Sequence, residues 1–164
     1  MFAAKKIISI DKLADCRAKL RELGKPLVLT NGCFDLLHAG HIYALEQAAC
    51  YGDVLWVGIN SDASVKRLKG PKRPVYPQEE RLYILSALEC VQGVFTFDGN
   101  DLAKEMQIIK PDVYVKSGDY SLEKLNPKER SVLEACNAKI VFTPFLPGKS
   151  TTQTLEALSQ ENYK

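Results

Sequence analysis

Residues 26–51 read PLVLTNGCFDLLHAGHIYALEQAACY, and this stretch decides the fold class. It opens with a short apolar run over residues 26–30, which is typical of a buried strand. A loop of glycine and polar residues follows, and segment 40–51 then has the apolar spacing of a helix that Gly52 would end. The stretch therefore predicts a strand, a loop and a helix in succession.

The same alternation of strands and helices runs through the rest of the chain. Further buried strands are predicted at 54–59, 91–97, 112–116 and 139–143, and helices at 11–23, 61–68, 77–89, 101–109, 127–136 and 150–158. Asp11 and Ser61 are placed to cap two of these helices, and Pro77 stands near the start of another. Strands that alternate with helices form a parallel sheet covered on both faces. We therefore expect a Rossmann-like, doubly wound α/β fold with five parallel strands.

The composition is that of an ordinary globular protein, with 46% hydrophobic and 26% charged residues among 164. This length fits a single domain over residues 1–164, with residues 1–24 as a helical extension packed on it. The net charge is only +2, from 22 basic and 20 acidic residues. So small an excess argues against a general binder of nucleic acid or membranes, and any electrostatic task must be local.

The sequence also bears on the compartment of the protein. It contains no run of 18 apolar residues, and residues 1–9 are too short and too polar for a signal peptide. The five cysteines stand singly, so neither a zinc site nor a disulfide framework is indicated. We expect a cytoplasmic protein with reduced cysteines.

The first loop of the predicted sheet concentrates the residues that carry chemistry. In doubly wound folds, ligands bind beyond the carboxyl ends of the strands, where the strand order reverses. The loop after residue 30 holds both histidines of the chain, His38 and His41, at the start of a helix. A helix N-terminus attracts phosphate, and Gly32 and Gly40 allow close approach of the backbone to a ligand. Phosphate binding is one interpretation; a metal pair with Asp35 and purely structural histidines are two others.

The pattern Gly32-x-Phe34-Asp35-x-x-His38-x-Gly40-His41 resembles the signature of the cytidylyltransferase-like nucleotidyltransferase superfamily. This resemblance implies that both histidines hold the phosphates of a nucleoside triphosphate while pyrophosphate is released. It implies no covalent intermediate, because the phosphorylated acceptor is itself the nucleophile. The Mg²⁺ ion that such a reaction uses would be held mainly by the ATP phosphates rather than by protein ligands.

Further segments are similar to the adenylyltransferase domain of bacterial heptose synthesis enzymes, and the likeness covers residues 5–158. The segments that carry it are 60–70, 73–77, 80–81, 116–120 and 148–152. The resemblance implies transfer of AMP from ATP to D-glycero-D-manno-heptose 1-phosphate, giving ADP-heptose for lipopolysaccharide or another surface glycan. It also implies a homodimer, and no companion sugar-kinase domain is recognised, so we expect the stand-alone form.

The same resemblance implies roles for individual residues. Catalytic roles fall on His38, His41, Lys69 and Arg81. Nucleotide-binding roles fall on Thr30, Asn31, Gly32, Cys33, Phe34, Gly40, Asn60, Asp119, Ser150, Thr151 and Thr152. Binding of the sugar phosphate falls on Asp35, Lys66, Arg73 and Lys116. The family often has an arginine after the Ser-Thr pair that residues 153–155 lack, so Lys149 or Arg81 is expected to supply that charge.

Simpler interpretations stand beside three of these motifs. Ser150 to Thr152 also suit a plain helix N-cap, and Gly118-Asp119 also suit a plain turn. The basic run over residues 66–73 is either a solvated loop or a lid over the phosphates. Without interleaved aromatic residues, it does not predict binding of single-stranded nucleic acid.

Three rival functions remain at this level. The first is a cytidylyltransferase that uses CTP with glycerol 3-phosphate or a phosphorylated amino alcohol. The second is a nucleotide-binding module without catalytic activity. The third is a fragment related to class I tRNA synthetases, against which the short chain argues.

Overall fold

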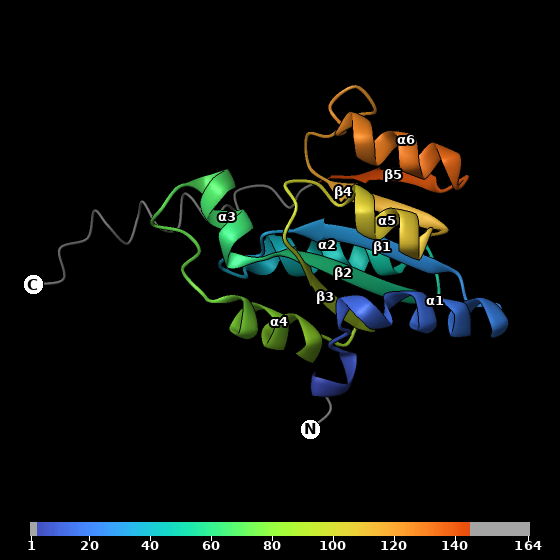
Figure 1. The fold of residues 1–164 in the computed structure, drawn as a ribbon, viewed down its shortest axis with the longest axis horizontal. Helices are drawn as coiled ribbons and strands as arrows, with labels where there is room; N and C mark the ends of the chain where they lie inside the picture. The colour runs from blue at the N-terminus through green and yellow to red at the C-terminus, as the bar shows by residue number, and fades with distance from the viewer. Residues whose placement is uncertain (1–2, 145–164) are drawn as a thin grey trace, which may run out of the picture.

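The computed structural model describes residues 3–144, which form a five-stranded parallel sheet with helices on both faces (Figure 1). The order of the strands is β3-β2-β1-β4-β5, and every neighbouring pair is parallel. The strands are β1 (Leu27–Gly32), β2 (Val54–Asn60), β3 (Gly93–Phe97), β4 (Val113–Ser117) and β5 (Lys139–Thr143). The predicted fold class is confirmed.

The helices form two layers around the sheet. They are η1 (Ala3–Lys6), η2 (Ile10–Lys12), α1 (Leu13–Glu22), α2 (Ala39–Ala49), α3 (Asp62–Lys69), α4 (Gln78–Ala87), α5 (Ala103–Ile109) and α6 (Pro127–Ala135). One core cluster joins the sheet to α1, α5 and α6 through Leu13, Met106 and Leu133. The other joins the opposite face to α2 and α4 through Leu45 and Leu85.

The strand order reverses between β1 and β4. From β1 the chain moves outward through β2 to β3, and it then returns to place β4 and β5 on the other side. Val28 of β1 pairs with Val113 of β4, and Leu27 pairs with Val54 of β2. The carboxyl ends of β1 and β4 therefore form the switch point at which this class of fold binds ligands.

The N-terminal helix differs from its prediction. A 3-10 turn, η2, precedes α1, and the N-cap residue of α1 is Lys12, which makes no side-chain capping bond. The predicted cap by Asp11 is therefore wrong, and the neighbouring Ser9 side chain lowers the pKa of the Asp11 carboxyl instead. The segment is held to the sheet further along, where the buried Arg17 donates to the carbonyl of Ile109 (3.0 Å) and to Asp112 (2.9 Å).

Other element ends shift by one or two residues. β3 begins at Gly93, because the Gln92 side chain is used to accept a hydrogen bond from the Leu55 backbone (2.8 Å). Pro77 is the N-cap residue of α4 rather than its first residue. The predicted cap by Ser61 is confirmed, since its hydroxyl accepts from the Ser64 backbone N–H (3.1 Å). The predicted helix at 150–158 lies outside the described residues.

Gly52 does more than follow a helix. α2 ends at Ala49, so the glycine stands beyond the helix rather than closing it. A Cβ atom at Gly52 would lie 2.9 Å from the carbonyl oxygen of Pro26 and 2.8 Å from the Val28 side chain. Such distances exclude any side chain, so this glycine lets the chain pass close to β1 before β2 begins.

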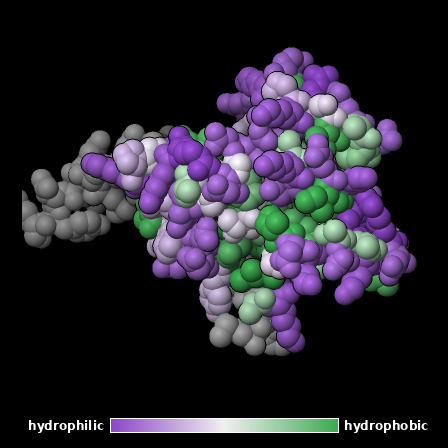
Figure 2. Space-filling view, in the orientation of Figure 1, coloured by the Kyte–Doolittle hydropathy of each residue, from purple (hydrophilic) through white to green (hydrophobic). Residues whose placement is uncertain are grey.

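Figure 2 shows the face covered by α1, α5 and α6, which is mostly hydrophilic with an apolar area in the middle. Exposed apolar side chains on these segments include Ile10 of η2 and Ile108 of α5. The helical layer on this face therefore covers the core less completely than a continuous layer would. No helix within residues 3–144 is long and apolar enough to cross a membrane.

Candidate active site

A cavity of about 610 Å³ opens at the carboxyl ends of β1 and β4. Its walls come from the ends of β1, β2 and β4 and the loops that follow β1, β3 and β4, together with α2, the end of α3 and the start of α6. It brings together ten of the predicted site residues, namely Thr30, Asn31, Gly32, Cys33, Phe34, Asp35, His41, Asn60, Lys69 and Lys116. His38, Gly40, Lys66, Arg73, Arg81 and Asp119 do not line it, although His38 stacks on His41, which does. Ser150, Thr151 and Thr152 lie outside the described residues.

His38 is the N-cap residue of α2, and its backbone is extended. Its Nδ1 accepts a hydrogen bond from the Gly40 backbone N–H at 3.1 Å. A neutral imidazole that accepts at Nδ1 carries its proton on Nε2. The cap thus selects the tautomer of His38 in which Nε2 is the hydrogen-bond donor.

His41 lies in the first turn of α2 and stacks on His38, with ring centroids 3.9 Å apart. Burial lowers the pKa of His41 to about 4, with further contributions from the nearby charges of His38 and Lys69. At neutral pH this imidazole is uncharged. Its Nδ1 is buried without a hydrogen-bond partner among the residues described. His41 can therefore act on a phosphate by hydrogen bonding but not as a cation.

The loop between β1 and α2 packs tightly around the Phe34 ring. Phe34 has a left-handed backbone (φ 46°), which turns its ring back toward β1. A Cβ atom on Gly32 would lie 3.1 Å from that ring, tighter than ordinary contacts. The same ring lies 5.3 Å from His41, so Gly32 and Phe34 together define one wall against the histidines.

Asp35 is fully buried, and its carboxylate is occupied by protein partners. It forms an ion pair with Arg73 and accepts from the Val75 backbone N–H at 2.5 Å. These contacts fasten the segment that precedes α4 to the first loop. The expected contacts of Asp35 and Arg73 with the sugar phosphate stay predictions, because in this structure the two side chains pair with each other.

Arg81 of α4 is 1% exposed and is used as a clamp. Its guanidinium donates to the carbonyl oxygens of Cys33 (2.7 Å), Asn60 (2.8 Å) and Tyr76 (3.0 Å). It also pairs with the Asp62 carboxylate at 2.7 Å. Arg81 thus joins the ends of β1 and β2 to the start of α4, and the expected catalytic role stays a prediction.

Asn60 ties three loops together at the end of β2. Its amide nitrogen donates to the Ser64 hydroxyl (2.9 Å), which donates to the Gly99 carbonyl (2.8 Å). Its amide oxygen lies 3.6 Å from the Cys33 sulfur. Burial raises the pKa of the Cys33 thiol, so this cysteine remains protonated and contributes packing rather than nucleophilic chemistry.

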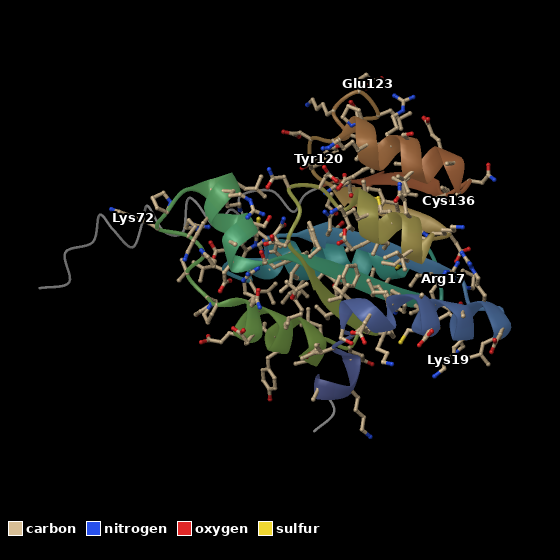
Figure 3. The ribbon with its side chains drawn as sticks, viewed as in Figure 1. Arg17, Lys19, Lys72, Tyr120, Glu123 and Cys136 are labelled. Carbon is tan, nitrogen blue, oxygen red and sulfur yellow. The ribbon has the colours of Figure 1, made fainter. Side chains whose placement is uncertain are left out.

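The basic residues of segment 66–73 are used in different ways. Lys69 lines the cavity, whereas Lys66 is exposed outside it. Arg67 donates to the Asp98 carbonyl and to the Asn100 side chain (3.2 Å). Lys72 points outward from the loop between α3 and α4 (Figure 3). The segment is therefore not a uniform lid, and Lys69 is its one basic side chain on the cavity wall.

Asp119 is exposed in the turn after β4. Gly118 has a left-handed backbone (φ 112°), and the Asp119 carbonyl accepts from Lys124 at 2.9 Å. The neighbouring Tyr120, labelled in Figure 3, lines the cavity instead. The expected contact of Asp119 with the nucleoside stays a prediction.

Sequence reasoning missed a buried network under the cavity. Tyr114, two residues before Lys116 on β4, donates to the Asn31 side chain at 2.7 Å, and Lys116 donates to the same oxygen at 2.7 Å. Burial lowers the pKa of Lys116, and Glu129 of α6 opposes that shift. Period-two alternation along β4 signals that Tyr114 shares a face with Lys116. Nothing in the sequence sets Glu129 apart from the exposed residues of its helix.

A protein-bound metal is not supported in the described part of the chain. Among residues 3–144, no group of three or more histidine, cysteine or acidic side chains is placed to hold an ion. The alternative of a metal pair at His38 and His41 therefore lacks the further ligands that it needs.

A doubly wound parallel sheet with two histidines at the helix N-terminus of its switch point defines a Rossmann-like protein. The family model described as cytidylyltransferase-like matches residues 29–157. The chain belongs to this family.

Curated relatives agree over almost the whole chain. The bifunctional protein HldE of Citrifermentans bemidjiense is 44% identical over 153 residues, covering 93% of this chain and 31% of that protein. The bifunctional protein HldE of Aliarcobacter butzleri is 46% identical over 155 residues, covering 94% of this chain and 30% of that protein. The chain thus spans about a third of the length of these relatives.

Two solved structures share the architecture. A lipopolysaccharide core biosynthesis protein from Thermoplasma volcanium has a TM-score of 0.62 at 26% identity, covering 75% of this chain and 98% of that one. The pantoate-beta-alanine ligase of Francisella tularensis has a TM-score of 0.56 at 15% identity, covering 96% and 80% of the two chains. The second likeness concerns the fold alone.

Proposed function

We propose that this protein is an adenylyltransferase that joins AMP from ATP to D-glycero-D-manno-heptose 1-phosphate, giving ADP-heptose and pyrophosphate. One observation carries the proposal: His38 and His41 stack at the N-terminus of α2, beside a cavity at the switch point of the sheet. The motifs that resemble heptose adenylyltransferases and the 44% identity to bifunctional protein HldE support the choice of substrates.

The chemistry follows from the groups around the cavity. A phosphate oxygen of the acceptor attacks the α-phosphorus of ATP, a new P–O bond forms, and the bond to the bridging oxygen breaks. Pyrophosphate leaves with that electron pair. The His38 Nε2 donor, the positive N-terminal end of the α2 dipole and the Lys69 ammonium favour the charge that develops on the phosphoryl oxygens.

A divalent cation, Mg²⁺ in this proposal, would neutralise part of the triphosphate charge. Since residues 3–144 offer no cluster of ligands for it, the ATP phosphates and water would hold the ion. The proposal also places the protein in the cytoplasm. It further includes a homodimer, and measurement of the mass in solution tests this oligomeric state.

The competing cytidylyltransferase differs in both substrates. A pyrophosphate-release assay with ATP or CTP separates the two, using both anomers of the heptose 1-phosphate, other sugar 1-phosphates and glycerol 3-phosphate as acceptors. We expect turnover with ATP and one heptose anomer. Preference for CTP and glycerol 3-phosphate contradicts the proposal, as does saturable binding of ATP without pyrophosphate release.

The His41→Ala variant tests the role of the histidine pair. Removal of one preorganised donor to a developing phosphoryl charge is expected to lower kcat by about 100-fold. Replacement of the exposed Tyr51, just beyond the C-terminal end of α2, by Ala is the control and should leave kcat unchanged. A His41→Ala protein with the full rate would remove the basis of the mechanism.

A further inference from the structure

One corner of the cavity is polar, and its cation, Lys116, has a carboxylate, Glu129, nearby. This α6-side corner consists of Asn31 from β1, Tyr114 and Lys116 from β4, and Glu129 from α6. Asn31, Lys116 and Glu129 line the cavity, and the Tyr114 hydroxyl lies among them. These side chains are on the sheet face opposite α2, away from the two histidines.

Hydrogen bonds fix the direction of the Asn31 amide. Its oxygen accepts from the Tyr114 hydroxyl and from the Lys116 ammonium, each at 2.7 Å. Two donors fill the two lone pairs of that oxygen. The amide nitrogen has no protein acceptor within the described residues, so its N–H groups are available to a ligand in the cavity.

Glu129 supplies the complementary acceptor. It is 4% exposed, and its Oε1 accepts from the Leu102 backbone N–H at 2.9 Å. Its Oε2 lies 3.4 Å from the Tyr114 hydroxyl, whose single proton points to Asn31 at the shorter distance. This carboxylate oxygen therefore keeps acceptor capacity at the cavity wall.

The charges of the corner select a neutral polar ligand. Lys116 and Glu129 carry opposite charges, so the corner has no net charge, and the carboxylate would repel a phosphate. Across the cavity, Lys69 faces the histidines, and the carboxylate of Asp35 is already paired with Arg73. Phosphate groups are thus favoured on the α2 side. A hydroxyl suits the other side because it donates to a carboxylate and accepts from an amide or ammonium.

We propose that the α6-side corner binds neighbouring hydroxyl groups of a sugar, with Glu129 accepting and Asn31 and Lys116 donating. Tyr114 acts as a positioning residue that holds the Asn31 amide in the required direction. This inference rests on the proposed function, whose two substrates both carry such hydroxyls: the ribose of ATP and the acceptor sugar. The experiment below distinguishes these two sources.

Equilibrium binding measures the preference for hydroxyls directly. One arm compares ATP with 2′-deoxy-ATP and 3′-deoxy-ATP, and the other compares the heptose 1-phosphate with its monodeoxy analogues. A site that loses a hydroxyl leaves buried polar groups unpaired, so the protein should prefer the complete ligand by about tenfold or more in one arm. The arm that shows the preference identifies the sugar.

The Glu129→Gln variant should reduce that preference to about twofold, because the amide replaces an anionic acceptor by a weaker neutral one. The matched control is Glu134→Gln on the same helix, where the exposed Glu134 pairs with Arg130, four residues earlier. It should keep the full preference. Thermal unfolding monitored by circular dichroism checks that both variants fold.

Tyr114→Phe removes only the hydroxyl and provides a second test if Glu129→Gln does not fold. We expect it to lower the preference by about threefold to tenfold, the value of one neutral hydrogen bond. The proposal is overturned if the protein shows no preference in either arm, or if folded Glu129→Gln and Tyr114→Phe both retain it. Absence of pyrophosphate release with every acceptor would refute the transfer reaction, whereas the binding arms would still decide the hydroxyl site.

Discussion

At the scale of single residues, the histidine pair shows how burial determines chemistry. His38 donates from Nε2 because its Nδ1 caps the helix, and His41 is neutral because burial disfavours its charged form. Both features follow from the position of the loop at the start of α2. The sequence indicated the pair because the only two histidines of the chain stand within one short motif.

The lowered pKa of His41 predicts a dependence of stability on pH. The folded state binds a proton at about pH 4 and the unfolded state at about 6.5, so folding is favoured above pH 6.5 and the contribution is lost as the pH falls toward 4. The loss amounts to about 2–3 kcal/mol. Urea unfolding of the protein and of His41→Gln should be compared from pH 7 to 4. The free energy of unfolding of the parent protein should fall relative to that of the variant as the pH is lowered. A constant difference contradicts the prediction.

Arg81 shows what the sequence conceals at this scale. Its three carbonyl partners belong to Cys33, Asn60 and Tyr76, which lie far apart in the chain. No local pattern marks a residue whose partners are backbone oxygens, so its function as a clamp emerges only from the fold. The same holds for Glu129, which occupies an ordinary helical position in the sequence.

The clamp predicts a large effect of Arg81→Lys. A lysine cannot reach four acceptors at once, so buried carbonyl groups lose their partners and the free energy of unfolding should fall by about 2–4 kcal/mol. Denaturant unfolding measures this loss, and Arg67→Lys at the exposed surface is the control. If Arg81→Lys lowers only kcat and leaves stability unchanged, the arginine acts on substrate and not as a clamp.

At the scale of elements, hydrophobic patterning predicted every described strand but not each boundary. The β3 strand starts at Gly93 because the Gln92 side chain holds β2, and α1 is preceded by a 3-10 turn instead of an Asp11 cap. Boundaries depend on such side-chain contacts between distant segments. The residues of the core can be predicted more reliably, because the spacing of apolar residues in the sequence indicates which side chains are buried.

The segment between α3 and α4 is held to the first loop by Asp35, which predicts the behaviour of Asp35→Asn. The variant keeps an acceptor for the Val75 N–H but loses the ion pair with Arg73. Local opening should become easier by about 1.4 kcal/mol, and trypsin should cleave after Lys72 about ten times faster. Asp98→Asn removes the exposed ion pair with Arg67 but keeps an oxygen that can accept from the Ser61 hydroxyl, and it should not change the rate.

At the scale of the whole molecule, the parallel sheet and its two layers followed from the alternation of strands and helices. The order of the strands could not be obtained in this way, because the same pattern suits several arrangements. The structure places β1 and β4 side by side, and this pairing is what brings the first loop and Lys116 to one cavity. The active-site loops were thus predictable, whereas their mutual contacts were not.

At the amino ends of the strands, opposite the cavity, a substitution should lower the stability of the fold without changing the affinity for ligands. Arg17 joins α1 to Asp112, which in turn accepts from the Leu27 backbone N–H at 2.6 Å, all at the amino ends of β1 and β4. Arg17→Met should lower the free energy of unfolding by about 2–3 kcal/mol, because Asp112 and two carbonyl groups lose their partner. The affinity for ATP should stay the same. Arg21→Met, which removes one long contact with Lys110 at 3.3 Å, is the control.

This division has an evolutionary consequence. Residues that fasten β1, β4 and the N-terminal helix sit at one end of the molecule, while the groups that meet ligands project from the other. Natural selection can exchange ligand-facing side chains such as those of Asn31 or Glu129 without loosening that anchor. A single ancestral frame could accordingly have diversified toward new acceptors while its thermodynamic foundation stayed in place.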